Sequence, residues 1–187
     1  MNITRKTIVV FGVPRSGTSM VAGMLRCLGI YMGERIKPDK HEDLDMLWQP
    51  LGVRISTIKK RNAERGVWGW KDPLVGQYIN SVGRLLINPM IVYITRDAED
   101  AIECDLRRNP NNSRRYVTAR NRALTASMNG AARGKPCIRM TYEGVLADPA
   151  TWASALAQFI DEPIQAAQIR RAAEFVRPGG YRTMEGV

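Results

Sequence analysis

Residues 12–19 (GVPRSGTS) have the composition and position of a phosphate-binding loop. The segment follows an apolar stretch, opens a helical pattern, and contains two glycines, Gly12 and Gly17, and a Thr18-Ser19 pair. Glycines let the backbone curl so that its N–H groups point inward, and the N-terminus of the following helix adds a partial positive charge. This pattern predicts that the loop binds the phosphate of a nucleotide or a similar anion.

The position of the loop's cation separates it from loops that bind nucleoside triphosphates. A Walker A loop has lysine after its second glycine, where the side chain reaches the β- and γ-phosphates. Here Thr18 occupies that position, and the cation is Arg15, inside the loop. The apolar run that ends at Thr95 is followed by Arg96 and not by a carboxylate that would hold Mg²⁺. The loop is therefore suited to a shorter and less charged 5′ group than a triphosphate.

Four short apolar runs predict the strands that carry this loop: Thr7–Phe11, Val67–Trp70, Met90–Thr95 and Cys137–Thr141. The first and third are nearly continuous and β-branched, as expected of strands buried on both faces of a parallel sheet. The runs alternate with helical patterns, which predicts right-handed crossovers. The expected fold is therefore α/β, a three-layer P-loop domain over residues 1–187 with a mainly parallel sheet of about four or five strands.

Apolar stripes at helical spacing predict the helices between these strands. A glycine stops the first stripe, a proline interrupts the second, and an Asp-Pro pair precedes the third. The predicted helices cover residues 20–28, 44–58 with an interruption near Pro50, 152–160 and about 164–175.

The residues that follow each predicted strand indicate where a ligand binds. Open parallel sheets bind ligands beyond the carboxyl ends of their strands. Besides the loop, these residues are Lys71-Asp72, Arg96-Asp97 and Tyr142-Glu143. Three of the four strand ends supply a cation and the fourth supplies an aromatic ring. Such a combination suits a nucleotide.

The composition is that of a basic globular protein. The 187 residues carry a formal net charge of +10, which favours anionic partners without choosing among them. No apolar run approaches the roughly 20 residues of a membrane span, and the first apolar segment is too short for a signal peptide, so a cytoplasmic location is expected. Three cysteines without CxxC spacing and a single histidine predict no metal site and no disulfide framework.

Four segments of the chain resemble motifs of the sulfotransferases that use 3′-phosphoadenosine 5′-phosphosulfate (PAPS), in particular bacterial members. They come in the family's order and span most of the chain. The resemblance implies a P-loop fold and transfer of a sulfuryl group from PAPS to a hydroxyl or amine of an acceptor, without a metal. The segments are 14–19 (PRSGTS, the 5′-phosphosulfate loop), 70–73 (WKDP), 91–97 (IVYITRD, the 3′-phosphate motif) and 142–149 (YEGVLADP).

This resemblance implies the roles of the residues that bind the cofactor. Arg96 is expected to hold the 3′-phosphate and Tyr142 to lie near the adenine. The family usually has serine eight residues after the motif arginine, and here that residue is Cys104, a much weaker donor. Either Arg107 or Arg108 compensates, or the affinity for the cofactor is lower. The 5′-phosphosulfate is expected to be bound by Arg15, by the amides of Ser16, Gly17 and Thr18, and by the hydroxyls of Thr18 and Ser19.

Sulfuryl transfer needs a cation on the leaving side and a base on the acceptor side. Lys71 is the candidate for the leaving or bridging oxygen. The acidic segment over residues 41–45 (HEDLD) resembles a segment in the acceptor region of bacterial sulfotransferases. Glu42 is the first candidate for the base, followed by His41 and Asp43. Asp72 is a further alternative.

The expected acceptor is a small molecule or a saccharide. Six arginines lie on or around one predicted helix pair, where a solvated helical face explains them, although they could also guide an anionic acceptor. Nucleic acid is not an expected partner, and the sequence does not indicate an oligomeric state. The six are Arg107, Arg108, Arg114, Arg115, Arg120 and Arg122.

Two other functions fit parts of the pattern. A small-molecule or nucleotide kinase with an altered loop would need Mg²⁺ and a carboxylate near Ser19, for which Asp97 is the evident candidate. A non-catalytic, degenerate P-loop protein would show no turnover. If its arginines attracted nucleic acid, its affinity would fall steeply with salt.

Overall fold

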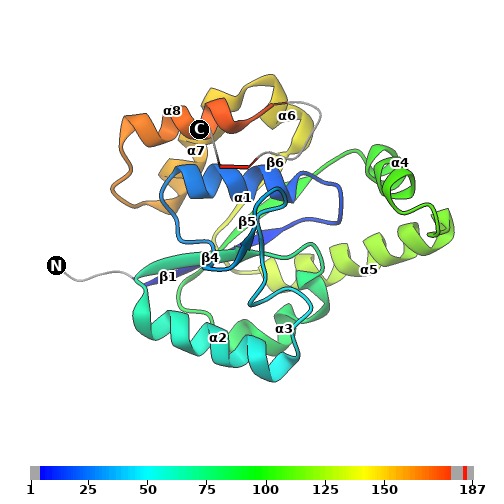
Figure 1. The fold of residues 1–187 in the computed structure, drawn as a ribbon, viewed down its shortest axis with the longest axis horizontal. Helices are drawn as coiled ribbons and strands as arrows, with labels where there is room; N and C mark the ends of the chain where they lie inside the picture. Colours follow the sequence, from blue (N-terminus) through cyan, green and yellow to red (C-terminus); the bar gives the residue numbers. More distant parts are fainter. Residues whose placement is uncertain (1–4, 178–182, 185–187) are drawn as a thin grey trace.

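Four parallel strands form the centre of the computed structural model, which describes residues 5–177 and 183–184. They lie in the order β4-β1-β5-β6, and each neighbouring pair is parallel (Figure 1). All four coincide with predicted strands to within one residue at each end, so the predicted α/β fold with a mainly parallel sheet is confirmed. The strands are β1 (Lys6–Phe11), β4 (Val67–Lys71), β5 (Pro89–Thr95) and β6 (Cys137–Thr141).

Helices cover both faces of this sheet, which gives the three layers that the sequence predicts (Figure 1). Successive strand residues point to opposite faces. Val10 and Val92 therefore pack under one helical layer, and Val9 and Ile91 under the other. The first layer contains α1 (Thr18–Cys27), α6 (Tyr142–Ala147), α7 (Pro149–Ile160) and α8 (Ala166–Phe175). The second contains α2 (Leu51–Glu64), α3 (Ile79–Val82), α5 (Arg114–Ala132) and the 3₁₀ turns η1 (Val75–Gln77) and η2 (Gly83–Leu85).

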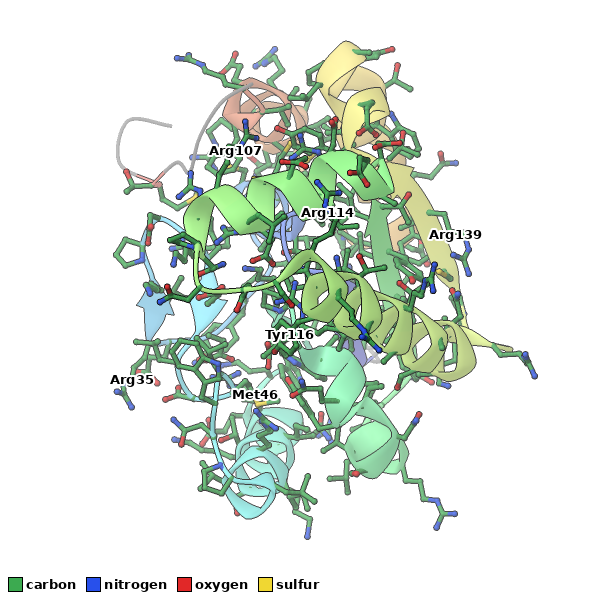
Figure 2. The ribbon with its side chains drawn as sticks, turned by 90° about the vertical axis from the view of Figure 1, so that its right-hand side faces the viewer. Arg35, Met46, Arg107, Arg114, Tyr116 and Arg139 are labelled. Carbon is green, nitrogen blue, oxygen red and sulfur yellow. The ribbon has the colours of Figure 1, made fainter. Side chains whose placement is uncertain are left out.

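Two helices follow the carboxyl end of β5. Helix α4 (Ala98–Arg108) is capped by Asp97, whose side chain accepts hydrogen bonds from the amides of Glu99 and Asp100, both at 3.0 Å. Helix α5 is capped by Ser113, whose hydroxyl accepts a hydrogen bond from the amide of Tyr116. Figure 2 shows the two helices side by side, with Arg114 between them. Arg114 pairs with Glu99 and Glu103 of α4, so this arginine joins the two helices.

A short hairpin precedes the region of the predicted second helix. Strands β2 (Ile36–Lys37) and β3 (Glu42–Asp43) pair antiparallel, which the sequence analysis did not predict. The stripe over residues 44–58 predicted a helix interrupted near Pro50, and helix is present only from Leu51 onwards. Residues 44–48 form turns, in which Trp48 has a left-handed φ of 54°, and Pro50 has an extended ψ of 151°. The prediction was wrong for this first half.

The remaining predicted helices agree with the structure apart from their ends. Helix α7 starts at Pro149, directly after the Asp148 cap, and α8 starts at Ala166 with a capping box between Gln165 and Gln168. Among the described residues, no helix combines the length and the apolar character that a membrane crossing requires.

Candidate functional site

The loop over residues 12–19 bends back on itself directly before α1. Arg15 has a φ of 71° and Gly17 a φ of 98°, both left-handed. A Cβ on Gly17 would lie 2.7 Å from the ring of Tyr142, so only glycine fits at this point. Ser16 is buried, and both its amide (3.1 Å) and its hydroxyl (2.7 Å) donate to the carbonyl oxygen of Val13. Ser16 thus shapes the loop from within. Its amide was expected to bind the 5′-phosphosulfate but is engaged by Val13, which leaves the amides of Gly17 and Thr18 for a ligand.

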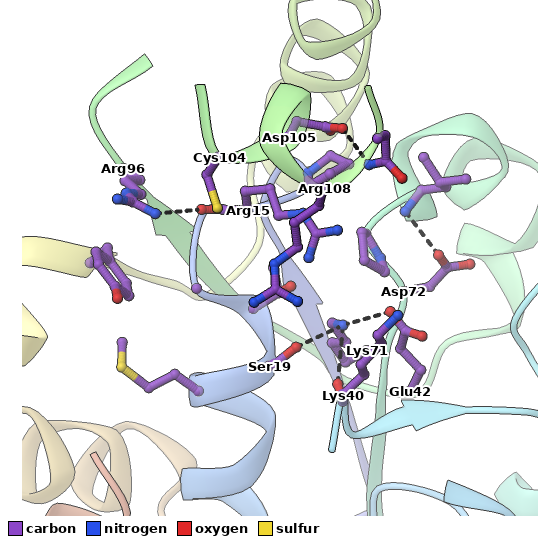
Figure 3. A pocket seen from close by; sticks show the side chains of 18 of the residues that line it. Arg15, Ser19, Lys40, Glu42, Lys71, Asp72, Arg96, Cys104, Asp105 and Arg108 are labelled. Carbon is purple, nitrogen blue, oxygen red and sulfur yellow. Dashed lines mark hydrogen bonds and ion pairs between the residues drawn. The ribbon is translucent and has the colours of Figure 1, made fainter. Parts of the chain in front are cut away.

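A cavity of about 650 Å³ lies at the carboxyl ends of the strands, above this loop (Figure 3). All four groups that were predicted to follow the strands reach it. Among the described residues its lining contains eight cationic side chains and three carboxylates, so its potential is positive. The predicted site residues that line it are Arg15, Gly17, Thr18, Ser19, Glu42, Lys71, Arg96, Cys104 and Tyr142.

Lys71 places a buried cation at the end of the loop. Its residue is 1% exposed, and its ammonium donates to Ser19 Oγ (3.2 Å), the Lys40 carbonyl (3.2 Å) and Glu42 Oε1 (3.0 Å). The register of the sheet pairs Lys71 with Val10, next to the loop. The loop has no lysine after Gly17, and Lys71 of the neighbouring strand β4 therefore places a cation next to it. Burial lowers the pKa of Lys71, and the charge of Glu42 opposes this effect.

Arg96 and Tyr142 lie together on the other side of the loop. The pairing of Thr95 with Thr141 places them side by side, and the guanidinium lies 4.6 Å from the centroid of the tyrosine ring. Arg96 Nη1 donates to the carbonyl of Arg15 at 3.4 Å, whereas its buried Nε has no hydrogen-bond partner among the described residues. Buried donors are nearly always satisfied, so this one indicates a ligand.

Helices α4 and α5 contribute an acidic group that the sequence analysis missed. Asp105 is buried and accepts hydrogen bonds from Arg120 Nη2 (2.5 Å) and Asn109 Nδ2 (2.7 Å). Burial alone would raise the pKa of Asp105, but these two donors and the nearby positive charges outweigh it and hold the pKa below its usual range. The four-residue spacing of Asp105 and Asn109 was the available sequence signal. The network fixes this part of the cavity wall.

Of the six arginines on this helix pair, three line the cavity: Arg107, Arg108 and Arg120. Arg120 is neutralised by Asp105, and Arg114 is engaged by two glutamates of α4. In Figure 3, Arg15 and Arg108 extend into the middle of the cavity, between Arg96 and Asp72. Arg108 is the fourth residue after Cys104, one helical turn further along the same face of α4.

The structure places two of the three predicted bases outside the cavity. His41 is 1% exposed, its Nδ1 lies 2.9 Å from Arg26 Nη1, and its ring packs edge-on against Phe175. Asp43 is fully buried and forms a two-pronged ion pair with Arg61. Glu42 lies between them on β3, where successive side chains point to opposite sides, and it alone reaches the cavity.

Asp97, the candidate Mg²⁺ ligand of a kinase, does not lie at the loop. Asp97 caps α4 and does not line the cavity. Among the described residues, no group of three or more His, Cys, Asp or Glu side chains has an arrangement that could hold a metal ion. The site is therefore built from cations, and its carboxylates are paired or dispersed.

Solved structures with a similar fold include sulfotransferases. A sulfotransferase domain from the curacin biosynthetic pathway matches with a TM-score of 0.63 and 14% identity, and one from a Synechococcus olefin synthase with 0.65 and 16%. The present chain has the sulfotransferase fold. Each match covers 88% of this chain and 76% of the other. A mouse sulfotransferase crystallised with 3′-phosphoadenosine 5′-phosphate (PAP) matches with a TM-score of 0.59 and 13% identity. This match covers 90% of the present chain and 64% of the mouse chain.

Comparison at the level of sequence adds nothing to this. No family model matches the chain, and no curated protein is similar to it. The sulfotransferase fold is thus established by structure, while the chemistry has to be argued from the site.

Proposed function

We propose that the chain transfers a sulfuryl group from PAPS to a hydroxyl or amine of an acceptor. The observation that carries the proposal is the buried Lys71 ammonium beside Ser19, at the end of a phosphate loop without its own lysine. The sulfotransferase fold and a neighbour crystallised with PAP support it.

The residues present fit PAPS. The amides of Gly17 and Thr18 follow a left-handed turn at the start of α1, where the helix dipole favours an anion. Arg15 supplies the charge within the loop. The unsatisfied Nε of Arg96 supplies a donor on the side of Tyr142, whose ring is available to the adenine. PAPS would supply the activated sulfuryl group.

Lys71 and Glu42 act as a pair in this proposal. All three protons of the ammonium have partners, so Lys71 can turn one of them toward a developing negative charge at the loop only by weakening another hydrogen bond. Burial lowers the pKa of Lys71, and the charge and hydrogen bond of Glu42 act against this effect, so Glu42 favours the protonated lysine. A buried cation stabilises charge on the leaving oxygen more strongly than an exposed one, because water does not screen it.

For the 3′-phosphate we propose Arg96 together with Arg107 or Arg108. Cys104 lines the cavity in the position of the usual serine, and both arginines extend from the last turn of the same helix. They would compensate for the weak thiol donor. The acceptor is proposed to be a small molecule or a saccharide.

Arg96→Ala should lower the affinity for 3′-phosphoadenosine 5′-phosphate (PAP) roughly 10- to 100-fold, the loss expected for a charge-assisted hydrogen bond. Affinity for adenosine 5′-phosphate, which lacks the 3′-phosphate, should change much less. Isothermal titration of both nucleotides measures this, and Cys104→Ser is the control that should bind PAP as well as, or better than, the parent protein. An equal loss for both nucleotides would place Arg96 elsewhere on the ligand.

PAP should raise the melting temperature without any metal. At a concentration of 100 Kd a ligand stabilises the folded state by about 2.7 kcal/mol, which for a chain of this size is a shift of roughly 5–10 °C. The shift should be the same in excess EDTA. No response to PAP together with a response to Mg-ATP would favour the kinase. Binding of PAP without turnover of PAPS on any acceptor would favour a non-catalytic protein.

A further inference from the structure

An uncharged, exposed segment lies at the mouth of the cavity. Residues 46–53 (MLWQPLGV) carry no charge, and they include three of the four large apolar side chains that are exposed in the described part of the chain. Trp48 is 75% exposed, Leu51 43% and Val53 44%, and we call these three side chains the apolar tip. Exposed apolar clusters of this kind mark surfaces that bind a partner.

The turn that carries Trp48 is fixed although its backbone is strained. The left-handed φ of 54° is costly for a tryptophan. The turn is held by hydrogen bonds from Gln49 Nε2 to the Leu44 carbonyl (3.0 Å) and from Arg54 Nε to the Met46 carbonyl (2.9 Å). The strained turn thus keeps a large apolar ring at the surface instead of in the core.

Helices α4 and α5 give the same side of the molecule a basic surface. Residues 106–142 contain nine arginines and lysines and no aspartate or glutamate. Carboxylates of α4 already pair with Arg114 and Arg120. Arg115 and Arg122 are exposed and form no ion pair with a described residue, so their charges are left for a partner.

The start of α5 reinforces this positive potential. Its first turn contains Arg114 and Arg115 and no acidic residue, although the N-terminus of a helix already carries a partial positive charge and favours acids. Arg115 and Arg122 are seven residues apart, which places them two turns apart on one face of the helix. Tyr116, 54% exposed, lies beside them. This face of α5 therefore favours an anionic surface.

The two surfaces meet at one cavity. Trp48 lines it from the apolar tip, and Arg107 and Arg108 line it from the end of α4. Figure 2 looks at this side of the molecule, with Arg107 above Tyr116, and with Met46 of the turn before Trp48 below them. A partner that covers the mouth of the cavity would therefore contact both an apolar and a basic surface.

We infer that the apolar tip and the basic face of α5 dock the protein on an anionic lipid bilayer. The indole of Trp48, with Leu51 and Val53, enters the headgroup region, where an amphipathic ring is favoured, and Arg115 and Arg122 bind lipid phosphates. The mouth of the cavity would then face the headgroups. The inference goes beyond the proposed sulfuryl transfer and does not depend on it.

Other partners match this face less well. A soluble polyanion would neutralise the arginines and leave the apolar tip uncovered. A second copy of the chain would cover the tip, but each copy has a net charge of +10, so the contact would bring like charges together. An anionic bilayer supplies both an apolar layer and a negative charge.

Sedimentation with sucrose-loaded vesicles tests the basic part. The parent protein should bind vesicles of equimolar phosphatidylglycerol and phosphatidylcholine, and bind phosphatidylcholine vesicles much more weakly. Arg115→Gln with Arg122→Gln should lower the partition coefficient roughly 30-fold, a factor of about five for each arginine. Arg84→Gln with Arg133→Gln is the matched control and should change it little. These two exposed arginines precede β5 and β6, at the end of the sheet away from the cavity.

The apolar tip is tested separately. Leu51→Ser with Val53→Ser should weaken binding to the anionic vesicles roughly tenfold, because less apolar area leaves water. Lipids brominated on their acyl chains should quench the tryptophan fluorescence of the bound parent protein. Trp48→Phe should abolish the quenching, since the other three tryptophans are buried or half-buried. Melting temperatures show that these variants are folded.

Three results would overturn the inference. The first is no sedimentation of the parent protein with anionic vesicles, and binding of heparin in that case would assign the arginines to a soluble polyanion. The second is vesicle binding that survives unchanged in both the arginine and the Leu51, Val53 double variants. The third is unquenched fluorescence of the bound parent protein. Titration with PAP remains a separate test of the proposed function, because neither double variant changes a residue proposed to bind the nucleotide.

Discussion

Lys71→Met should lower kcat for sulfuryl transfer roughly 100- to 1,000-fold, while the affinity for PAP falls much less. The variant removes the buried donor that lies 3.2 Å from Ser19 Oγ, and loss of one preorganised donor at a developing charge has a cost of this size. The measurement is the release of PAP from PAPS at saturating donor and acceptor, with isothermal titration of PAP beside it. Lys60→Met, which replaces an exposed lysine of α2, is the matched control and should change neither quantity.

The pH profile separates this role from a structural one. The protonated form of Lys71 is the active one, and burial lowers its pKa, so kcat should decline as the pH rises through that value. Lys71→Arg retains the charge at any working pH and should move the alkaline limb upward. A Lys71→Met protein with the kcat of the parent, or a limb that stays in place in Lys71→Arg, would contradict the assignment.

Asp43→Ala should destabilise the fold by about 3–5 kcal/mol, which corresponds to a fall in melting temperature on the order of 10 °C. The Asp43 carboxylate is fully buried. Arg61, whose side chain is 5% exposed, would lose its contact with Asp43 on both prongs of its guanidinium and keep only the hydrogen bond from Nη2 to Asp45. Urea and thermal unfolding measure the effect. Asp161→Asn is the control, because that side chain is 92% exposed and its contact with Lys6 is 3.8 Å long.

The same variant bears on the choice of base. We expect the soluble fraction of Asp43→Ala to retain nucleotide binding, since Asp43 does not line the cavity. If the variant does not fold, Asp43→Asn combined with Arg61→Met removes both charges together and should recover stability. An Asp43 variant with the parent's melting temperature and no turnover would show that the residue is catalytic after all.

The features that could be predicted from the sequence are those that local patterns determine. The strand over residues 89–95 is nearly continuous in apolar residues, and the loop over 12–19 follows another such strand. Parallel strands bring their carboxyl ends to one edge, so Arg15, Lys71 and Arg96 were expected at one site, and all three line the cavity.

The acceptor side could not be predicted in the same way, because it depends on packing between distant segments. His41, Glu42 and Asp43 are equivalent as a sequence pattern, and only the β2–β3 hairpin, invisible in the apolar periodicity, decides that Glu42 alone faces Lys71. The predicted helix before Pro50 failed because residues 44–48 form turns after the hairpin, where Met46 packs into the core and Leu47 and Trp48 line the cavity.

The last helix of the fold has a consequence for the smallest chain that can keep this site. Phe175, at the end of α8, lies against the ring of His41 and against Gly23, where any Cβ would come within 2.0 Å of its ring. His41 precedes Glu42 in the hairpin. The position of the Glu42 carboxylate thus depends on the side chain of Phe175, more than 130 positions later in the sequence. A fragment that ends before Phe175 would contain every proposed donor to the loop and yet lose the support that keeps Glu42 beside Lys71.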